Sequence, residues 1–493
     1  MRQLLLVAAL LAAASPWGGL LAAPRSGLVP EATAARHGLT RAWFTQIQLD
    51  PSRTRVQDVV LHEGTLYVQT NRAMVHAIDA ETGKTIWAKE VGRPNHPSLT
   101  PSVGDDLLGV INGSRLYVCN RYNGDLLFEI RVDGVPGAGV CLSKRRVYVP
   151  MVSGMLLAYR LEPLADPLKE LGKTEKKPTP QQIVATEKDR RDNLRLGQES
   201  VPPLKCYSLG RALVQPLVTR ETETDEYVAW ATDQGYLYVG FVDLQEENRL
   251  AIKYRLQTAA GIVARPTYLP PNPNDPADSG IIFAASRDGY INAVRERDGK
   301  LLWRFPTGEP LIEPAEVIDE RTYVTTQPGG MYCLDATTGS QVWWTPQIRQ
   351  FVAASRQRIY ATDLLGRILI LSVETGARLD TLAAESLPIK LVNSQTDRLY
   401  LATETGLIQC LHELELSQPI RHGEARKKKA EEKPPEIQQK GIDEVKPAKK
   451  PAAPKKAAPK KKEPGEEPAA PKKGAPKKKE PGEESPAKEK PFN

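Results

Sequence analysis

Apolar residues recur at every second position in eight short segments along the chain. When each segment is aligned on its last residue, the eight anchors are Asp79, Asn120, Arg160, Phe241, Arg295, Asp335, Ser372 and His412. The residues two and four positions before each anchor are apolar in every copy, as Ala77 and Val75 are in the first. Spacing by two places both on one face of an extended strand. The pattern therefore predicts eight similar strands, each with one buried face.

A turn and a second apolar run precede most of these strands. Glycine stands six positions before the anchor in six copies: Gly154, Gly235, Gly289, Gly329, Gly366 and Gly406. Before it come runs such as TLYVQT and RLYLAT, whose β-branched and aromatic residues are typical of hairpin strands. Successive anchors are 41, 40, 81, 54, 40, 37 and 40 residues apart, and about 40 to 45 residues is the period of a four-stranded propeller blade.

We therefore predict an all-β fold, an eight-bladed β-propeller of four-stranded antiparallel blades over residues 41–423. Seven blades is the alternative if the copy at Arg160 or Phe241 is irregular. The segment Arg41–Leu49 precedes the first complete repeat, and we expect it to pair with the last repeat around Leu399–Leu414, so that no sheet edge stays open.

The two long gaps have visible causes. LPPNPNDPADSG, from Leu269 to Gly280, is a loop between strands, and residues 161–206 form a charged insertion. Within the insertion, TPQQIVATEKDRRDNLRL predicts one exposed helix that projects from a face of the propeller and covers or flanks the channel. Insertions in repeat proteins often carry the specific function, although their sequences also vary without any functional role.

A tryptophan follows three anchors at a fixed distance. The order of small residue, any residue, Asp, three residues, Gly-Lys, two residues and Trp is complete only at Ala77, Asp79, Gly83, Lys84 and Trp87. One copy has Arg295 in place of the Asp and keeps Ala293, Gly299, Lys300 and Trp303; another has Ser340 in place of the Lys and keeps Cys333, Asp335, Gly339 and Trp343. Degenerate copies include Gly124 with Phe128, and Gly376.

This order resembles the docking motif of the pyrroloquinoline-quinone (PQQ) repeat propellers, and the resemblance covers residues 41–420. In that family the Trp packs between adjacent blades, and the Gly lets backbone approach closely. The residues themselves support a structural role, because a turn carboxylate such as Asp79 or Asp335 caps local N–H groups. An aromatic repeated at a fixed offset is first an inter-blade contact.

The resemblance implies two kinds of function. Quinoprotein dehydrogenases of the family hold PQQ and calcium at the axis and carry an adjacent cysteine pair, which this sequence lacks. Its candidate axial carboxylates, Asp105, Asp106, Glu313 and Glu316, are not singled out by any motif. The non-catalytic branch includes the eight-bladed lipoprotein subunit of the outer-membrane β-barrel assembly machinery, which is similar in length and blade count. This chain departs from that subunit by lacking a lipidation cysteine and by adding the insertion and a tail.

We therefore expect a non-catalytic scaffold that binds a protein or peptide partner, with no catalytic, cofactor-binding or metal-binding residue. One alternative is a dehydrogenase that uses PQQ with calcium. A second is an envelope polymer or glycan binder, for which the aromatic residues Tyr227, Trp230, Tyr236 and Tyr238 are the visible support.

The N-terminal residues predict export. One Arg is followed by an apolar run of 20 residues from Leu4 to Ala23, interrupted by Pro16 and two glycines. This pattern is typical of a secretory signal peptide over residues 1–23, with a retained membrane anchor as the alternative. We expect a monomer of the periplasm or cell envelope with no transmembrane span after cleavage.

The five cysteines, Cys119, Cys141, Cys206, Cys333 and Cys410, are an odd number in a chain predicted to be exported. Three lie in or beside the apolar positions two and four residues before the anchors, so we expect buried free thiols rather than disulfides. The sequence contains no CxxC or HExxH motif, so nothing in it supports a zinc site.

The net charge of +7 comes entirely from the C-terminal tail. Residues 424–493 hold 21 Lys and Arg against 13 Asp and Glu, which leaves a net charge of −1 for residues 1–423. The tail is rich in Pro, Ala, Lys and Glu and contains APKKKEPGEE twice, a composition that predicts disorder. We expect it to act as a spacer or to bind polyanions weakly, and we expect no sequence-specific contact with nucleic acid.

Overall fold

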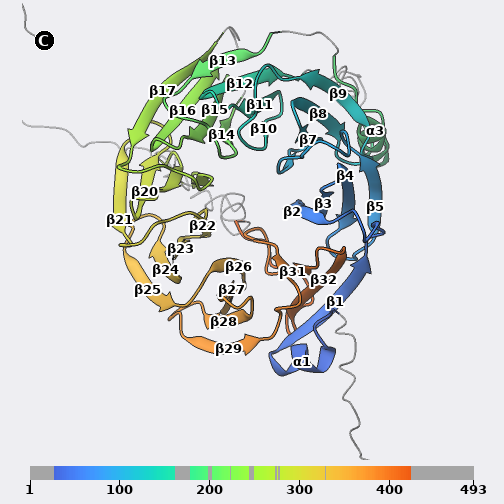
Figure 1. Ribbon diagram of the computed structural model, residues 1–493, viewed down its shortest axis with the longest axis vertical. Helices are drawn as coiled ribbons and strands as arrows, with labels where there is room; N and C mark the ends of the chain where they lie inside the picture. The colour runs from blue at the N-terminus through green and yellow to red at the C-terminus, as the bar shows by residue number, and fades with distance from the viewer. Residues whose placement is uncertain are drawn as a thin grey trace, which may run out of the picture. The chain divides into compact units, whose positions relative to one another are not determined.

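A computed structural model of the chain describes residues 27–161, 178–197, 202–222, 224–243, 249–272, 275, 278–327 and 329–423. The described residues form eight four-stranded antiparallel sheets, arranged as blades around a central axis (Figure 1). The prediction of an eight-bladed propeller is confirmed, and the seven-bladed alternative is wrong. The predicted signal peptide and tail lie outside the described residues.

Strands are given from the axis outward. Blade 1 contains β2 (Val56–His62), β3 (Thr65–Thr70), β4 (Met74–Asp79) and β5 (Thr85–Glu90). Blade 2 contains β6 (Ser102–Val103), β7 (Leu107–Asn112), β8 (Arg115–Asn120) and β9 (Leu126–Arg131). Blade 3 contains β10 (Cys141–Leu142), β11 (Arg146–Pro150), β12 (Met155–Arg160) and β13 (Leu204–Tyr207). Blade 4 contains β14 (Leu217–Glu221), β15 (Asp225–Ala231), β16 (Tyr236–Asp243) and β17 (Leu250–Gln257).

The second half of the ring follows the same order. Blade 5 contains β18 (Thr267–Leu269), β19 (Ile281–Ala285), β20 (Tyr290–Arg295) and β21 (Leu301–Pro306). Blade 6 contains β22 (Glu316–Ile318), β23 (Arg321–Thr326), β24 (Gly330–Asp335) and β25 (Gln341–Pro346). Blade 7 contains β26 (Gln350–Ala354), β27 (Arg358–Thr362), β28 (Ile368–Ser372) and β29 (Arg378–Leu382). Blade 8 contains β30 (Ile389–Lys390), β31 (Leu399–Ala402), β32 (Leu407–Glu413) and β1 (Leu39–Gln46).

The ring closes in blade 8, whose outer strand comes from the N-terminal end of the described chain. β1 pairs antiparallel with β32 from Leu39 opposite Glu413 to Gln46 opposite Leu407. A short helix, α1 (Glu31–Arg36), precedes β1. The predicted pairing of the first and last repeats is therefore confirmed, and it removes the open sheet edge at the seam.

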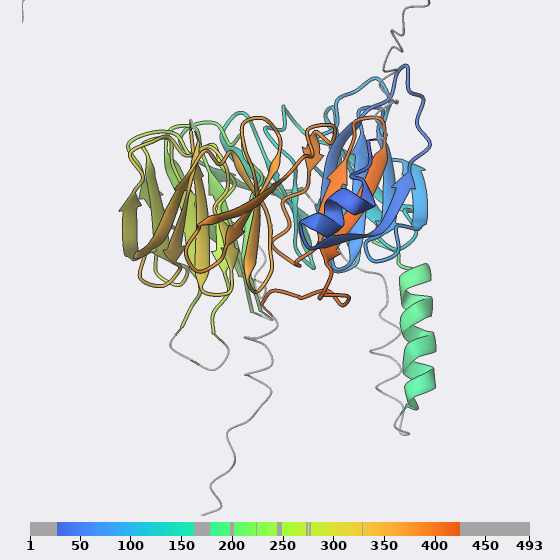
Figure 2. The same cartoon turned by 90° about the horizontal axis from the view of Figure 1, so that it is seen from below.

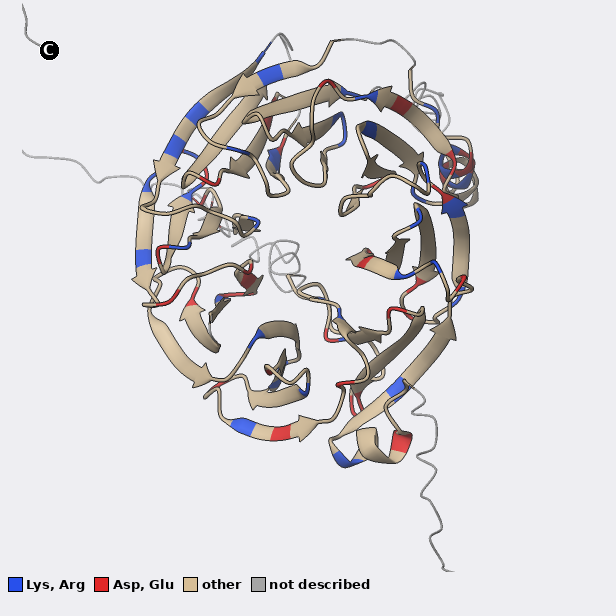
Figure 3. Ribbon diagram, viewed as in Figure 1, with Lys and Arg blue, Asp and Glu red and all other residues tan. Residues whose placement is uncertain are grey.

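The core consists of apolar clusters shared between adjacent blades. One cluster joins Tyr67, Ala77 and Trp87 of blade 1 to Leu108 and Cys119 of blade 2. The apolar columns seen in the sequence are buried, and all five cysteines are free and buried as expected. Lys and Arg occur together with Asp and Glu around the ring (Figure 3).

Antiparallel connections give the ring two distinct faces. The loops between blades and the turns between second and third strands lie on one face, which we call the upper face. The turns between first and second strands and between third and fourth strands lie on the opposite, lower face. Figure 2 shows these faces edge-on, with α3 extending below the ring.

α3 (Pro180–Asp192) is the helix predicted within the insertion. Thr179 caps it: its side chain accepts from the Gln182 N–H, while the Gln182 side chain accepts from the Thr179 N–H. No residue of α3 is buried, and the helix projects from the lower face at the rim rather than over the channel (Figures 1 and 2). The insertion ends earlier than residue 206, because β13 completes blade 3 and Cys206 pairs with Leu156.

The C-terminal end of α3 is held against blade 2. The guanidinium of Arg190 donates to both carboxylate oxygens of Asp106, at 2.7 and 3.0 Å, and Asn120 Nδ2 donates to the carbonyl oxygen of Arg191 at 2.6 Å. Beyond the helix, Leu194 and Leu196 pack into the cluster shared by blades 2 and 3, beside Phe128. The insertion thus fills a junction where the docking motif is degenerate.

Replacing Arg190 by Gln should release α3 from blade 2 and leave the propeller intact. A helix of this length is marginal alone in water, so loss of the bidentate ion pair exposes its amides to exchange. We expect faster hydrogen exchange over residues 180–192, with the unfolding midpoint unchanged within about 2 °C. Arg195→Gln, at an exposed position of the same insertion, is the matched control, and equal exchange in both variants would show that the Asp106 contact does not hold the helix.

Candidate functional site

The motif tryptophans lie at the junctions between blades. Trp87 donates its indole N–H to the carbonyl oxygen of Arg121 in blade 2, at 2.9 Å. The indole N–H of Trp303 donates to the carbonyl oxygen of Ala336 in blade 6 at 3.1 Å, and that of Trp343 donates to the carbonyl oxygen of Val373 in blade 7 at 2.9 Å. Each tryptophan therefore ties its own blade to the next one along the chain.

The motif glycines receive these aromatic rings. A Cβ atom added at Gly124 would lie 2.7 Å from the ring of Trp87, and one at Gly339 would lie 2.4 Å from that of Trp303. Gly376 meets Trp343 in the same way, at 2.5 Å. All three glycines also have φ between 68° and 76°, a region that favours glycine. A tryptophan thus packs on the glycine of the following repeat, not on that of its own.

The other motif residues cap turns and fill the space beneath the rings. Asp79 Oδ1 accepts from the N–H of Thr82 at 2.7 Å, and Asp335 Oδ1 accepts from that of Thr338 at 2.7 Å. Ala77 and Ala293 are fully buried and face Trp87 and Trp303 across their hairpins. Where Phe128 stands in place of the Trp, it packs against the apolar cluster shared by blades 2 and 3, to which Leu196 of the insertion also belongs.

Sequence reasoning missed two aromatic contacts between blades. The indole N–H of Trp43, on β1, donates to the carbonyl oxygen of Ala80 in blade 1 at 3.0 Å, and its ring packs on Gly83. Tyr254 of blade 4 stands where a tryptophan stands elsewhere: its hydroxyl donates to the carbonyl oxygen of Glu296 at 2.8 Å, and its ring packs on Gly299. The glycines were visible in the sequence, but the partner one blade earlier could be found only after the ring was closed.

Blade 7 uses an ion pair in place of an aromatic ring. Asp380 Oδ2 lies 2.5 Å from Nδ1 of His37, which precedes β1 in blade 8. Arg358 donates to the carbonyl oxygen of His37 at 3.2 Å and completes this contact. Hydrogen bonding to His37 lowers the pKa of the Asp380 carboxyl.

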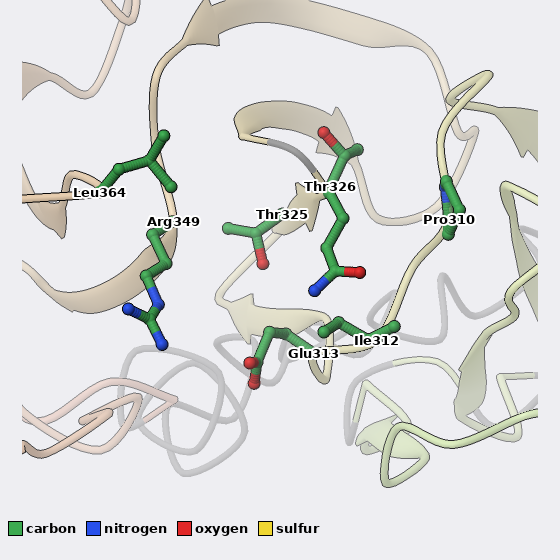
Figure 4. A pocket seen from close by; sticks show the side chains of 8 residues that line it. Pro310, Ile312, Glu313, Thr325, Thr326, Arg349 and Leu364 are labelled. Atoms are coloured by element: carbon green, nitrogen blue, oxygen red, sulfur yellow. The ribbon is translucent and has the colours of Figure 1, made fainter.

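A concave site lies on the upper face, at the mouth of the channel between blades 6 and 7. It is a pocket of about 550 Å³. Figure 4 shows Arg349 and Leu364 on one side of it, Glu313 and Ile312 below, and Pro310 opposite. Thr325 and Thr326 of β23 and the exposed Gln327 complete the lining.

Arg349 and Glu313 face this pocket without neutralising each other. The backbone N–H of Arg349 donates to the carbonyl oxygen of Thr362 at 2.8 Å, which fixes the base of the side chain. Within the described residues, its exposed guanidinium makes no hydrogen bond or ion pair. Burial raises the pKa of Glu313, and the charge of Arg349 opposes that shift only in part.

Glu316 lies deeper in the channel, at the start of β22. Burial raises the pKa of its carboxyl to about 7, against a hydrogen bond with Ser394 and the positive charge of Arg265. Burial also lowers the pKa of Lys390, on the first strand of blade 8, and repulsion from Arg349 adds to that shift. The channel mouth thus combines partly desolvated groups of both signs.

A rigid turn stands at the rim of the pocket. The buried carboxylate of Asp363 accepts from the N–H groups of Leu365 and Arg367, at 3.0 and 2.9 Å, and pairs with the Arg367 guanidinium at 2.7 Å. The turn holds Leu364 and Leu365 outward, and their exposed fractions are 59% and 68%. Two adjacent exposed leucines on a fixed turn form an apolar lip next to the charged pocket.

The lower end of the channel carries a different feature, residues 414–423, which we call the strap. The buried Arg398 donates to the carbonyl oxygens of Leu416 and Ser417, at 2.9 and 2.7 Å. Further along, His422 Nε2 lies 3.0 Å from the carbonyl oxygen of Ala354, and the Gly423 N–H donates to Asp319. The strap therefore crosses the lower ends of blades 8, 7 and 6 near the axis, and the pocket is approached from the upper face.

Of the four candidate axial carboxylates, only two reach the channel mouth. Glu313 and Glu316 line adjoining cavities there. Asp105 and Asp106 lie instead at the turn between β6 and β7 on the lower face, where Asp105 is 3.6 Å from Lys144 Nζ and Asp106 holds α3. Partial burial raises the pKa of Asp106, but hydrogen bonds from Arg190 and Tyr122 outweigh it and leave the pKa lowered.

The described axial residues do not offer the donor set of a calcium and quinone site. Calcium takes about six to eight oxygen ligands. No three His, Cys, Asp or Glu side chains within the described ranges are grouped closely enough to hold a metal ion. The sequence contains no adjacent cysteines that could stack on a quinone.

Comparison with known proteins assigns the family. The family described as "Outer membrane protein assembly factor BamB" matches residues 27–161 and 287–409, together more than half of the chain. The chain belongs to this family. Among curated proteins, no sequence matches the chain.

Solved structures show that the BamB-family fold is shared widely at low identity. BamB from Moraxella catarrhalis is 13% identical, with a TM-score of 0.52 over 76% of this chain and 97% of that one. Sqt1 from Saccharomyces cerevisiae is 9% identical, with a TM-score of 0.52 over 73% of this chain and 96% of that one. A quinohemoprotein alcohol dehydrogenase from Pseudomonas putida HK5 is 11% identical, with a TM-score of 0.47 over 76% of each chain.

Of the aromatic residues considered for glycan binding, Trp230 and Tyr238 are buried and stack on each other at 5.3 Å, and Tyr227 is 8% exposed. In the described part of the chain, we find no helix long and apolar enough to cross a membrane.

Proposed function

We propose that this chain is an exported, non-catalytic scaffold of the cell envelope that binds a protein or peptide partner at the upper mouth of its channel. The observation that carries the proposal is the pocket between blades 6 and 7, with its charged walls and its apolar lip. Membership of a family described as an outer membrane protein assembly factor supports a role among envelope proteins.

The chemistry of the pocket suits a polypeptide segment. An extended peptide presents N–H donors and C=O acceptors along its length, and the pocket offers a guanidinium donor at Arg349, a carboxylate acceptor at Glu313 and an amide at Gln327. Leu364 and Leu365 can bury apolar side chains of the same segment. A small number of polar groups beside apolar contact area is typical of recognition sites.

Rigidity of the ring supports this function. Blades 6 and 7, which build the pocket, are tied together by the hydrogen bond from Trp343 to the carbonyl oxygen of Val373. The pocket is therefore formed before a partner arrives, and binding costs little ordering of the scaffold. Within the part of the chain that the structure describes, the lining of the pocket forms no nucleophile, base and oxyanion-donor arrangement. We therefore assign no catalytic residue.

The test is site-specific crosslinking. We expect a photoreactive amino acid at Leu364 to form a defined adduct with an envelope protein in the source cells. The same substitution at Val342, a 42% exposed residue of the outer wall, is the control and should give a much weaker adduct. In the Leu364 background, Arg349→Ala should reduce the adduct at least several-fold.

Two results would contradict the proposal. Equal labelling from Leu364 and Val342 would show that the upper mouth is not a binding site. Thermal unfolding of the purified protein with PQQ and calcium should show no shift of the midpoint, because only a ligand that binds the folded state raises it. A shift of several degrees at micromolar cofactor would favour the dehydrogenase alternative.

A further inference from the structure

The pocket presents one guanidinium that forms no ion pair within the described part of the chain. This Arg349 guanidinium has no hydrogen-bonded or ionic partner among the described residues. Lys390 lies beside Gly366 of the leucine-bearing turn, and its ammonium group donates to the carbonyl oxygen of Leu387 at 2.6 Å. Asp363 pairs with Arg367, and Glu309 accepts from the Thr326 hydroxyl at 2.5 Å. The negative charges of Glu385 and Asp363 act on Lys390, so Arg349 is the cation of this pocket that offers a free guanidinium.

Glu313 is the remaining acidic group of the lining, and it lies below the pocket, where the charge of Arg349 acts on it (Figure 4). No ion pair joins the two within the described part of the chain. A carboxylate that enters beside Arg349 would meet this guanidinium, while Glu313 can accept a peptide N–H from the same segment. Charge-assisted hydrogen bonds from a fixed guanidinium are about twice as strong as neutral ones.

We infer that the upper mouth recognises an acidic residue flanked by apolar residues on the partner segment. The acidic side chain pairs with Arg349, and an apolar neighbour packs on Leu364 and Leu365. The inference rests on the proposed function and specifies the chemistry of the partner. Charge complementarity at Arg349 and the adjacent exposed leucine pair are the two observations that select this occupant.

Three synthetic peptides test the inference. Each is fluorescein-labelled and amidated, with the sequence Gly-Gly-Leu-X-Leu-Gly-Gly, where X is Asp, Asn or Lys, and binding to the full chain is measured by fluorescence anisotropy. We expect the Asp peptide to bind at least tenfold more tightly than the Asn peptide and the Lys peptide to bind more weakly than either. Replacing Arg349 by Gln should remove the Asp preference.

Controls separate a local contact from the general field of the protein. Arg131→Gln removes an exposed arginine of the outer strand β9 and should leave the Asp preference unchanged. Unchanged far-ultraviolet circular dichroism and an unchanged unfolding midpoint would show that each variant is folded.

Equal binding of the Asp and Asn peptides, failure of all three peptides to bind, or loss of the preference in Arg131→Gln would overturn the inference. The proposed function is tested separately by the Leu364 adduct. An adduct that forms without any acidic preference in the peptides would leave the scaffold function standing and remove only the assignment of an acidic partner.

Discussion

Replacing Trp343 by Ala is expected to lower the free energy of unfolding by about 3 to 5 kcal/mol, the range for large aromatic truncations in a core. The Trp343 ring packs on Gly376 of the next blade, and its N–H donates to the Val373 carbonyl oxygen at 2.9 Å. The substitution therefore opens a cavity between blades 6 and 7 and removes a hydrogen bond across that junction. Urea denaturation followed by tryptophan fluorescence and circular dichroism measures the loss.

The adjacent residue provides a matched control. Trp344 lies on the same strand with the same side-chain volume, but it faces outward and is 48% exposed, whereas Trp343 is 6% exposed. Trp344→Ala should therefore cost about 1 kcal/mol or less. Similar losses for the two variants would contradict the assignment of Trp343 as the docking residue of this junction. Because blades 6 and 7 build the pocket, Trp343→Ala should also weaken partner capture at Leu364.

Replacing Glu316 by Gln is expected to stabilise the protein at pH 8 and to leave its stability unchanged at pH 4. Burial raises the pKa of this carboxyl from 4.5 to about 7, so the folded state favours the protonated form. In the wild type, stability from this group is therefore lost as the pH rises from about 4.5 to 7 and stays low above that range. At 1.36 kcal/mol for each pH unit, the gain in Glu316→Gln at pH 8 amounts to up to about 3 kcal/mol.

The measurement is the difference in unfolding free energy between variant and wild type at several pH values. Glu320→Gln, an exposed position between β22 and β23, is the control and should show a flat difference. A flat difference for Glu316→Gln as well would mean that this carboxyl is solvated in the folded protein. A wild type that gains stability relative to Glu316→Gln as the pH rises would reverse the sign and contradict the buried position.

The closed ring explains why some docking residues escaped prediction. The motif at Trp303 and Gly299 reads as one local unit, yet Trp303 packs on Gly339 while Gly299 receives Tyr254. Tyr254 carries no motif of its own. Its hydroxyl takes the place of an indole N–H by donating to the carbonyl oxygen of Glu296 in the next blade. The pair Asp380 and His37 is even less visible, since its members are separated by 343 residues and meet only at the seam.

At the channel mouth, too, the sequence offered candidates but could not choose between them. Glu313 and Glu316 were candidates because they precede an inner strand, but the sequence offered equal reason to choose Asp105 and Asp106. Their roles differ because one pair lies before a first strand, near the axis, whereas the other lies in a turn on the opposite face. Arg349 had no local signal, since it comes from a different blade.

The sequence by itself determined the repeat, the buried apolar positions and the seam between the first and last repeats, and it favoured eight blades over seven. These features are local or periodic, and each repeat restates the same alternation of apolar and polar residues. The tertiary structure alone decided which tryptophan meets which glycine, where the insertion attaches and which charges share the channel mouth. Those contacts join residues of different blades, and their positions follow from the curvature of the closed ring, which no single repeat encodes.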